Sequence, residues 1–249
     1  MRVIAISNNK GGVGKTTCTV NIAAALRLRD KKVMVIDLDH QAQSTYHFGF
    51  NPKKIDKSIF HVLKEELPYK EILIDRNGID LIPANSDLKD IELMPIPAKE
   101  FLLKEAFAGL EGYDFVLIDC PPSLGVLTMN ALTFAREIFI PLQVQFLPFH
   151  GMYTLFEAVS MVKKRLNKDI DVTGIIGTMY NASKSINREV IEETKKRLPG
   201  KLFDTLIREN VSLQEAPSWG KTIFEYKPES NGAADYRTLT EEILTRPVS

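Results

Sequence analysis

Hydrophobic residues fall into short, nearly continuous runs, separated by stretches in which apolar positions recur every three or four residues. The short runs are rich in Val and Ile, which is typical of strands buried on both faces of a parallel sheet. They predict strands at residues 3–7, 33–37, 79–83, 115–119, 137–142, 172–179 and 201–207. The stretches between them predict helices at about residues 14–29, 98–110, 123–134, 151–166, 186–197 and 232–244.

This alternation predicts an α/β fold, with a single doubly wound, mostly parallel sheet flanked by helices. Residues 51–71 are polar and poorly periodic, and we expect them to decorate the edge of the sheet. No repeat, low-complexity linker or sharp change in composition divides the chain. We therefore expect residues 1–249 to form one domain.

Composition adds few constraints. The 32 Lys and Arg residues balance the 32 Asp and Glu residues, so any contact with DNA or membrane must come from a local patch. The first seven residues, MRVIAIS, are too short an apolar run for a signal peptide or a membrane span. Two cysteines that are far apart in the sequence, Cys18 and Cys120, indicate reduced thiols in a cytoplasmic protein.

The segment after the first predicted strand, residues 8–17, reads NNKGGVGKTT. It matches the phosphate-loop pattern GxxxxGK[ST] except that Asn9 replaces the first glycine. Glycines let backbone N–H groups curl around an anion, and the following helix directs its positive end toward the same anion. A plain glycine turn is the alternative, but a strand precedes this loop and a helix follows it. The predicted phosphate-binding residues are Lys10, Gly11, Gly12, Val13, Gly14, Lys15, Thr16 and Thr17.

Within this loop, Lys15 is expected to reach the β- and γ-phosphates, and the Thr16 hydroxyl to ligate Mg²⁺. Lys10 precedes the glycines, where a side chain cannot easily fold back into its own loop. It is either an ordinary solvated lysine or a residue that projects outward to a nucleotide held by a second subunit.

Strand ends supply acidic candidates. Asp119 closes the run at 115–119, the layout of a Walker B acid, and we expect it to hold Mg²⁺. Asp37 and Asp39 end another buried run, and ligands of open α/β sheets collect at the carboxyl ends of strands. A single aspartate there is often a turn residue, but three beside a phosphate loop favour catalysis. We assign Asp39 to orienting water and Asp37 to the metal region.

The motifs KGGVGKTT, VIDLDHQAQST, YDFVLIDCPPSLGVLTMNAL and EAPSWGK resemble the ParA/Soj group of DNA-partitioning ATPases, within the deviant Walker A superfamily of P-loop proteins. The resemblance extends over essentially the whole chain. It implies a homodimer that sandwiches ATP and Mg²⁺, in which Lys10 acts on the partner's nucleotide. It also implies that Lys15 and Asp39 are catalytic, that Asp119 is the Walker B acid, and that Asn181 and Pro217 enclose the adenine.

The same resemblance implies slow, switch-type ATP hydrolysis. The ATP-bound dimer would bind DNA non-specifically, and a ParB-like, centromere-binding protein would stimulate hydrolysis and release the dimer. The expected location is cytoplasmic, and nucleoid-associated in the ATP state. Only nine residues precede Lys10, so no N-terminal helix-turn-helix domain is expected.

Candidate DNA contacts are the basic residues of the C-terminal half, namely Lys184, Arg188, Lys195, Lys196 and Arg208. For residues 195–197 alone, a solvated helix face is the simpler interpretation. Dimerisation would duplicate and align such patches.

The chain departs from the family pattern at four positions. His40 replaces a proline, Gln145 and His150 stand where glutamates are common, and Ser212 replaces a common basic residue, although Arg208 is kept. These departures bear on switching and DNA affinity rather than on phosphate chemistry.

Three alternatives stay open. The first is a MinD-like membrane-associated ATPase, although residues 238–249 carry two acids, no lysine-rich face and Pro247. The second is an iron–sulfur carrier ATPase, although Cys18 and Cys120 form no CxxC pair. The third is a nucleotide-binding pseudoenzyme, although the catalytic set is complete.

Overall fold

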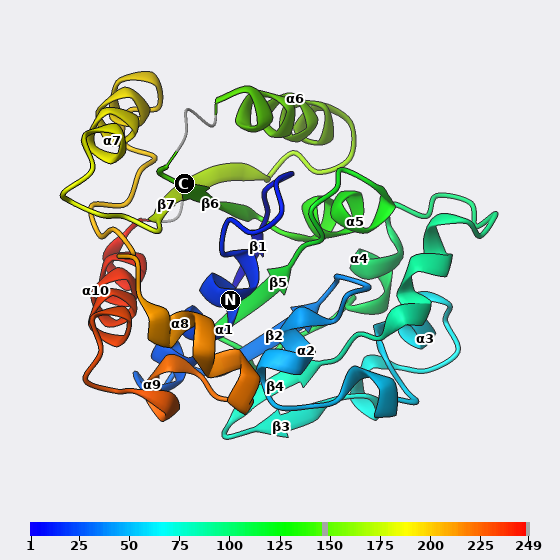
Figure 1. Ribbon diagram of the computed structural model, residues 1–249. Coiled ribbons are helices and arrows are strands. Elements are labelled where there is room, and N and C mark those ends of the chain that lie inside the picture. The colour runs from blue at the N-terminus through cyan, green and yellow to red at the C-terminus, as the bar shows by residue number, and fades with distance from the viewer. Residues whose placement is uncertain (146–148, 248–249) are drawn as a thin grey trace.

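The structure is a computed structural model that describes residues 1–145 and 149–247, apart from the side chains of residues 149–151. Within these residues, seven strands form one sheet in the order β3-β4-β2-β5-β1-β6-β7 (Figure 1). The strands are β1 (Arg2–Ile6), β2 (Val33–Asp37), β3 (Ile74–Arg76), β4 (Ile79–Ile82), β5 (Phe115–Asp119), β6 (Glu137–Gln143) and β7 (Asp171–Thr178). All neighbouring pairs are parallel except β3 and β4.

Helices connect the strands from β1 to β7, and further helices follow β7. They are α1 (Lys15–Arg27), α2 (Gln43–His47), α3 (Ile59–Leu63), α4 (Leu102–Ala106), α5 (Val126–Phe134), α6 (Phe149–Arg165), α7 (Ser185–Arg197), α8 (Val211–Glu215), α9 (Ile223–Tyr226) and α10 (Asn231–Thr245). Short 3₁₀ helices are η1 (Pro52–Lys54), η2 (Tyr69–Glu71), η3 (Ser86–Glu92) and η4 (Ala216–Trp219). The predicted fold class, a doubly wound and mostly parallel sheet between helices, is confirmed.

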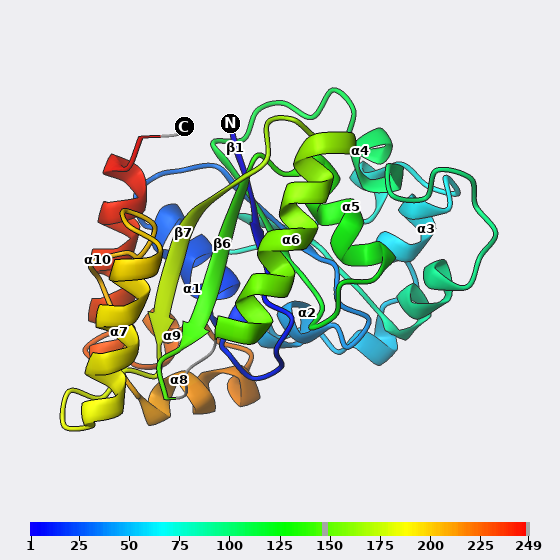
Figure 2. The same ribbon diagram turned by 90° about the horizontal axis from the view of Figure 1, so that it is seen from above.

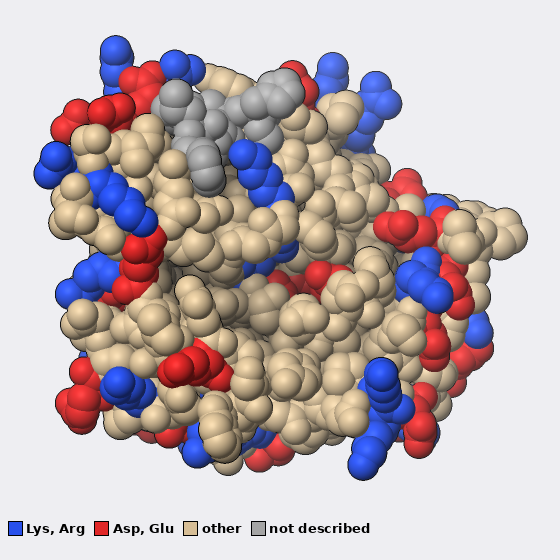
Figure 3. Space-filling view, in the orientation of Figure 1, with Lys and Arg blue, Asp and Glu red and all other residues tan. Residues whose placement is uncertain are grey.

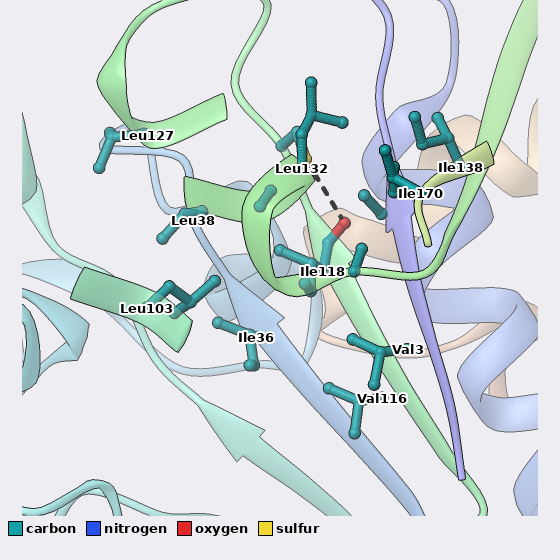
Figure 4. Packing of buried hydrophobic residues seen from close by; sticks show 14 of the residues in the cluster. Val3, Ile36, Leu38, Leu103, Val116, Ile118, Leu127, Leu132, Ile138 and Ile170 are labelled. Carbon is teal, nitrogen blue, oxygen red and sulfur yellow. Dashed lines mark hydrogen bonds between the residues drawn. The ribbon is translucent and has the colours of Figure 1, made fainter. Parts of the chain in front are cut away.

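The sheet separates two hydrophobic layers (Figures 1 and 2). On one face, α4, α5 and α6 cover the strands, and residues such as Leu103, Leu127 and Leu132 pack onto Ile36 and Ile118 (Figure 4). On the other face, α1 and α10 pack against the sheet and against each other. Because both faces are covered, the strands are buried throughout their length, which explains their continuous hydrophobic runs.

The strand predicted at 201–207 is wrong. This segment runs beside β7 but forms only isolated bridges, one of them between Ile175 and Leu202. A continuous ladder with β7 does not form because the N–H groups of Asp204 (2.9 Å) and Thr205 (3.0 Å) donate to the Glu242 carboxylate instead.

Strand β3 was not predicted. It pairs antiparallel with β4 through a hairpin whose turn residues, Asn77 and Gly78, have φ angles of 55° and 80°. Positive φ at both central positions is the geometry that Asn-Gly sequences favour in tight hairpins.

The helix predicted at 98–110 is much shorter, since α4 spans only Leu102–Ala106. The Asn130 side chain donates to the Lys99 carbonyl (2.7 Å) and accepts from the Leu103 N–H (2.8 Å), so these groups bond to α5 instead of extending the helix. The other predicted helices are present with shifts of a few residues at their ends.

Residues 51–71 do more than decorate the sheet edge. They contain α3, whose Ile59, Val62 and Leu63 are buried in the hydrophobic layer beneath β2 and β4. Among the residues that the structure describes, no helix combines the length and the apolar character that a membrane crossing requires.

Candidate functional site

The loop between β1 and α1 lies at the carboxyl ends of the parallel strands (Figure 2). Gly12 and Gly14 adopt φ angles of 73° and 94°, a left-handed backbone that glycine allows without strain. Neighbouring strands hold the loop in place. The Thr178 hydroxyl donates to the Val13 carbonyl (2.9 Å), and the Asn8 amide donates to the Pro141 carbonyl (2.7 Å).

Lys15, the first residue of α1, points back into this loop. Its ammonium group is buried and donates to the Lys10 carbonyl at 3.0 Å. Burial lowers the pKa of Lys15, while the charges of Asp119 and Asp39 act in the opposite direction. A buried cation beside a ring of backbone N–H groups favours an anion, so the loop fits the phosphates for which the sequence suggested it.

Thr16 and Asp119 meet beside the loop. Asp119 Oδ2 accepts hydrogen bonds from the hydroxyls of Thr16 and Ser44, each at 2.7 Å. Its other oxygen, Oδ1, is buried and has no hydrogen-bond partner among the described residues. A free carboxylate oxygen beside a hydroxyl is the kind of hard oxygen donor that Mg²⁺ prefers, so Thr16 and Asp119 fit this ion.

Asp37 lies next to Asp119 in the sheet register, and it is fully buried. Its Oδ2 accepts from the N–H and the hydroxyl of Thr45, both at 2.7 Å, and its Oδ1 accepts from the Asp39 N–H at 3.3 Å. Burial raises the pKa of Asp37 and of Asp119, and the negative charge of Asp119 raises that of Asp37 further. Both oxygens of Asp37 therefore hold the segment that carries Asp39, whereas Asp119 keeps one oxygen free.

Asp39 follows β2 and lines the cavity in front of the loop. Its carboxylate accepts from the Gln41 N–H at 2.9 Å. His40 lies at the same turn, with its Nδ1 3.6 Å from Asp39 Oδ1. Asp39 is thus fixed at the phosphate end of the cavity, where it can contact a water molecule.

Two adjoining cavities form the site, one of about 320 Å³ at the phosphate loop and one of about 490 Å³ beyond it. They share the wall residues Gly14, Thr17, Met179 and Pro217. Figure 3 shows the corresponding hollow near the middle of this face, with acidic and basic side chains at its floor. Together the two cavities are large enough for a nucleoside triphosphate.

Pro217, in η4, lines both cavities at the base end of the site. Asn181 lines neither cavity. Its side-chain amide instead donates to Glu209 at 3.0 Å, and Glu209 lines the larger cavity. Pro217 therefore lies in the wall that the two cavities share, whereas Asn181 lies behind Glu209 and outside that wall.

The exposed Lys10 side chain makes no hydrogen bond or ion pair within the part of the chain that the structure describes. Its backbone is held, because its N–H donates to Asn8 Oδ1 at 3.1 Å and its carbonyl accepts from Lys15. The backbone of Lys10 is thus fixed, while its ammonium group lies in solvent.

The candidate DNA-binding residues lie at the start of α7, along it and in the segment after it, and three of them are paired with acids. Lys184 pairs with Glu209 (2.7 Å), and Lys195 pairs with Asp204 (3.7 Å). Arg208 is held by Asp235, which accepts from its Nε at 3.0 Å. Along α7, Arg188 and Lys195 lie roughly 10 Å apart at 1.5 Å per residue, with Lys196 beyond them.

Two departures from the family pattern have structural partners. Gln145 donates to Glu209 at 2.6 Å, where a glutamate would repel that carboxylate. Ser212 is buried in the first turn of α8, and its N–H donates to Asn210. The side chain of His150 lies outside the described residues.

The cysteines are buried in different hydrophobic layers, Cys18 with α1 and Cys120 beside β5. Burial raises the pKa of both thiols, that of Cys18 to about 12. The described residues contain no cluster of three or more His, Cys, Asp or Glu side chains arranged around a metal. The two thiols therefore offer no paired ligands for an iron–sulfur cluster.

Three hydroxyl residues of the site were not predicted from the sequence: Ser44, which donates to Asp119, Thr45, which donates to Asp37, and Thr178, which donates to the phosphate loop. Ser44 and Thr45 stand in the VIDLDHQAQST motif, a few residues after the strand-end acids, so their position was a usable signal. Thr178 reaches the loop from a distant strand, which local sequence does not indicate.

Comparison with known proteins places this site in a family. An AAA domain model matches residues 1–172. The sporulation initiation inhibitor protein Soj of Bacillus subtilis is 39% identical over 97% of this chain and 98% of its own length. The chromosome-partitioning ATPase Soj of Thermus thermophilus is 38% identical over 99% of this chain and 96% of its own length.

Among solved structures, cobyrinic acid a,c-diamide synthase from Mycobacterium smegmatis, with bound ADP and magnesium, is similar to this chain with a TM-score of 0.87. It is 33% identical, and the match covers 98% of this chain and 94% of that one. The identity to the two Soj proteins extends over nearly the whole chain. This chain therefore belongs to the ParA/Soj family of P-loop ATPases.

Proposed function

We propose that this chain is a partitioning ATPase, which dimerises around ATP and Mg²⁺, binds DNA non-specifically in that state and leaves DNA on hydrolysis. One observation carries the nucleotide part of the proposal. Lys15, Thr16 and Asp39 line one cavity at the glycine loop, and the Thr16 hydroxyl donates to the buried Asp119 directly behind it.

In this proposal the loop binds the phosphates through backbone N–H groups, and Lys15 neutralises the β- and γ-phosphates. Thr16 and Asp119 would hold Mg²⁺, which would supply positive charge to neutralise the phosphates. Asp37 fixes the strand end through Thr45 and so sets the position of the metal region.

Asp39 orients the attacking water, because it lies in the cavity wall and its position is fixed by the Gln41 N–H. Positioning and electrostatic stabilisation are the main contributions of a protein to phosphoryl transfer. Slow turnover, in which ATP acts as a timer, suits a site where one carboxylate positions the water.

Dimerisation would use Lys10. Its exposed ammonium group has no partner in its own chain among the described residues, and its backbone is fixed at the mouth of the cavity. A second copy facing this mouth would bring each Lys10 to the other copy's nucleotide. Pro217 would contact the adenine, with Asn181 supporting the wall through Glu209.

DNA binding would depend on that dimer. In one chain, Lys184, Lys195 and Arg208 are partly neutralised by nearby acids and are spread along α7 and the segment after it. Two copies double the number of phosphate contacts, and affinity for DNA rises steeply with that number. A ParB-like protein would stimulate hydrolysis and release the dimer. The protein would then be cytoplasmic, single-domain and nucleoid-associated with ATP.

The membrane-associated alternative requires a free amphipathic C-terminal helix. In this chain the apolar face of α10, with Tyr236, Leu239 and Ile243, packs against α1 and is buried. A helix whose apolar face is part of the core cannot place that face in lipid. This observation supports the DNA-binding branch of the proposal.

The proposal is tested by the ATPase rate of the purified protein alone, with DNA, and with a candidate ParB-like protein. Synergistic stimulation by DNA and the partner is expected. Stimulation by anionic liposomes alone would favour the membrane branch instead. A gel shift with a non-hydrolysable ATP analogue at low salt should show DNA binding, and its absence would contradict the partition role.

A further inference from the structure

Glu209 lines the larger of the two cavities, the one beyond the phosphate loop. Among the described residues that line this cavity it is the one acidic side chain, and the others are apolar or uncharged except for Arg208. A few polar groups in a largely apolar wall usually determine which ligand a cavity accepts. The contacts of Glu209 and Arg208 therefore indicate which part of a nucleotide this wall can recognise.

The carboxylate of Glu209 is fixed at the surface of the cavity. Gln145, which lines the same cavity, donates from its side-chain amide to Glu209 Oε1 at 2.6 Å. The Lys184 ammonium group donates to the same oxygen at 2.7 Å, and the Asn181 amide donates to Oε2 at 3.0 Å. The Glu209 side chain is nevertheless 35% exposed, so a ligand in the cavity can reach it.

These hydrogen bonds leave one acceptor position of Glu209 unused. An ionised carboxylate can accept about four hydrogen bonds, shared equally between its two oxygens. In this structure Oε1 accepts from Gln145 and Lys184, and Oε2 accepts from Asn181. The hydrogen bonds from Lys184 and Asn181 lower the pKa of Glu209, so the group is ionised near pH 7 and carries no proton to donate. Oε2 can therefore take one further donor, but not an acceptor.

The positive charge of Arg208 is directed to a different partner. Asp235, which is buried, accepts from Arg208 Nε at 3.0 Å and from its Nη2 at 2.5 Å. A cation that is paired at such close range with an acid attracts a further acceptor less strongly. The wall therefore favours a ligand that donates to Glu209 over one that needs a donor from Arg208.

The nucleobase is the part of the nucleotide that this wall would contact. With the phosphates in the glycine loop, the base extends into the adjoining larger cavity, past the wall residues that the two cavities share. Adenine carries an amino donor at position 6, where guanine carries a carbonyl acceptor. The amino group can donate to the free position of Glu209, whereas a carbonyl oxygen would meet a negative charge there.

We propose that Glu209 Oε2 accepts a hydrogen bond from the 6-amino group of adenine, and that this contact makes the site select adenine over purines with a carbonyl oxygen at position 6. The inference rests on the nucleotide site of the proposed function and adds a specificity-determining residue to it. It requires neither dimerisation nor DNA binding.

The test compares the dissociation constants of ATP, inosine triphosphate and GTP, each with Mg²⁺, for the wild type and Glu209→Gln. Both inosine and guanosine carry a carbonyl oxygen at position 6. The wild type is expected to bind them about 10-fold or more weakly than ATP, which corresponds to one lost hydrogen bond to a charged group. In Glu209→Gln the ratio should fall to within about 3-fold, because an amide can donate to a carbonyl oxygen as well as accept from an amino group.

Glu209→Ala provides a second variant, which removes the acceptor and the negative charge together and should also lose the preference. Glu229→Gln, at an exposed position outside both cavities, is the matched control and should keep the wild-type ratio. The same ratio in the wild type, Glu209→Gln and Glu209→Ala would overturn the inference, as would equal binding of all three nucleotides by the wild type.

The outcome also separates this inference from the proposed function. A wild type that binds and hydrolyses ATP without any effect of Glu209 on the ratio would refute only the contact with the base. A wild type that binds none of the three nucleotides would refute both.

Discussion

At the phosphate end of the cavity, charged side chains are buried and face one another, whereas around α7 they are exposed and are mostly paired with their own neighbours. Lys15 and Asp39 line one cavity, and the charges of Asp119 and Asp39 both act to raise the pKa of Lys15. Lys184 and Lys195, in contrast, form separate ion pairs with Glu209 and Asp204.

This difference separates phosphate binding, which one chain can provide, from DNA binding, for which we expect two chains to be needed. Buried groups in low dielectric interact strongly, so a single chain already presents a formed phosphate site. Exposed ion pairs contribute little and are screened by salt, so the basic residues of one chain form a weak surface for DNA. Mutations at the phosphate end should therefore have large effects, and those around α7 should have smaller, salt-dependent effects.

The largest effect is expected for Asp39→Ala. Loss of the carboxylate that orients water should lower the ATPase rate by about 100-fold or more, a typical contribution of such a group. ATP affinity should stay within about 3-fold of the wild type, because Asp39 contacts water rather than the loop. Single-turnover hydrolysis and equilibrium binding measure the two quantities.

Asp30→Ala, at an exposed position after α1, is the matched control for Asp39 and should leave both quantities unchanged. Wild-type turnover in Asp39→Ala would remove Asp39 from its assigned role.

The second-largest effect is expected for Lys15→Ala. Without the buried ammonium group, ATP affinity should fall by about 30-fold or more, as for the loss of one member of a buried charge pair. Isothermal titration with ATP and Mg²⁺ measures the change. Lys54→Ala removes an exposed lysine and should have no effect. Unaltered affinity in Lys15→Ala would mean that the phosphates bind elsewhere.

Stability should also depend on pH through His47. Its folded-state pKa of about 4 lies below the ordinary value of 6.5, so the unfolded chain takes up a proton first as the pH falls. The unfolding free energy of the wild type should therefore decrease between about pH 6.5 and 4, by about 3 kcal/mol at most relative to His47→Phe.

Urea unfolding of both proteins from pH 7.5 to 4 measures this difference. Contributions from Asp37 and Asp119 cancel, since both proteins contain them. A pH-independent difference would show that His47 is exposed or charged in the folded protein.

The smallest effect is expected for DNA. In the ATP-analogue state, replacing Lys184 and Arg188 together by alanine should reduce the slope of log affinity against log salt concentration by about two per chain. The pair begins α7 close to the cavity, whereas Lys195 and Lys196 lie at its far end. Fluorescence anisotropy with labelled DNA over a salt series measures this slope and shows which end of α7 contacts DNA.

The Lys195→Ala, Lys196→Ala double variant serves as the comparison and should change the slope less. A larger change in this variant would place the DNA surface at the far end of α7. Equal slopes in all proteins would exclude α7 from DNA binding.

The residues at the phosphate end of the cavity could be predicted because their sequence signals are local. The glycine loop spans residues 8–17, and Asp37 and Asp119 each end a hydrophobic run. In a parallel sheet such strand ends meet at one edge, so their convergence on the loop could be expected. The Asn77-Gly78 turn was also a local signal for the β3–β4 hairpin, but β3 is three residues long and only half-buried.

The remaining features depend on the packing of distant segments. Thr178 on the loop, Glu209 beside Lys184 and Asp235 beside Arg208 are contacts across many residues of sequence. The segment at 201–207 has a strand-like composition, and only the contact with Glu242 on α10 shows why it does not form a ladder. The sequence shows which residues are basic, but it does not show which acids pair with them in the folded chain.

The central claim is that the loop of one chain forms half of a two-chain site through Lys10. Its most direct test is the solution mass of the wild type and Lys10→Ala by light scattering, with Mg²⁺ and a non-hydrolysable ATP analogue. The wild type should double in mass, while Lys10→Ala should bind the analogue and remain a monomer. A wild type that stays a monomer with bound nucleotide, or a Lys10→Ala variant that dimerises as the wild type does, would contradict it.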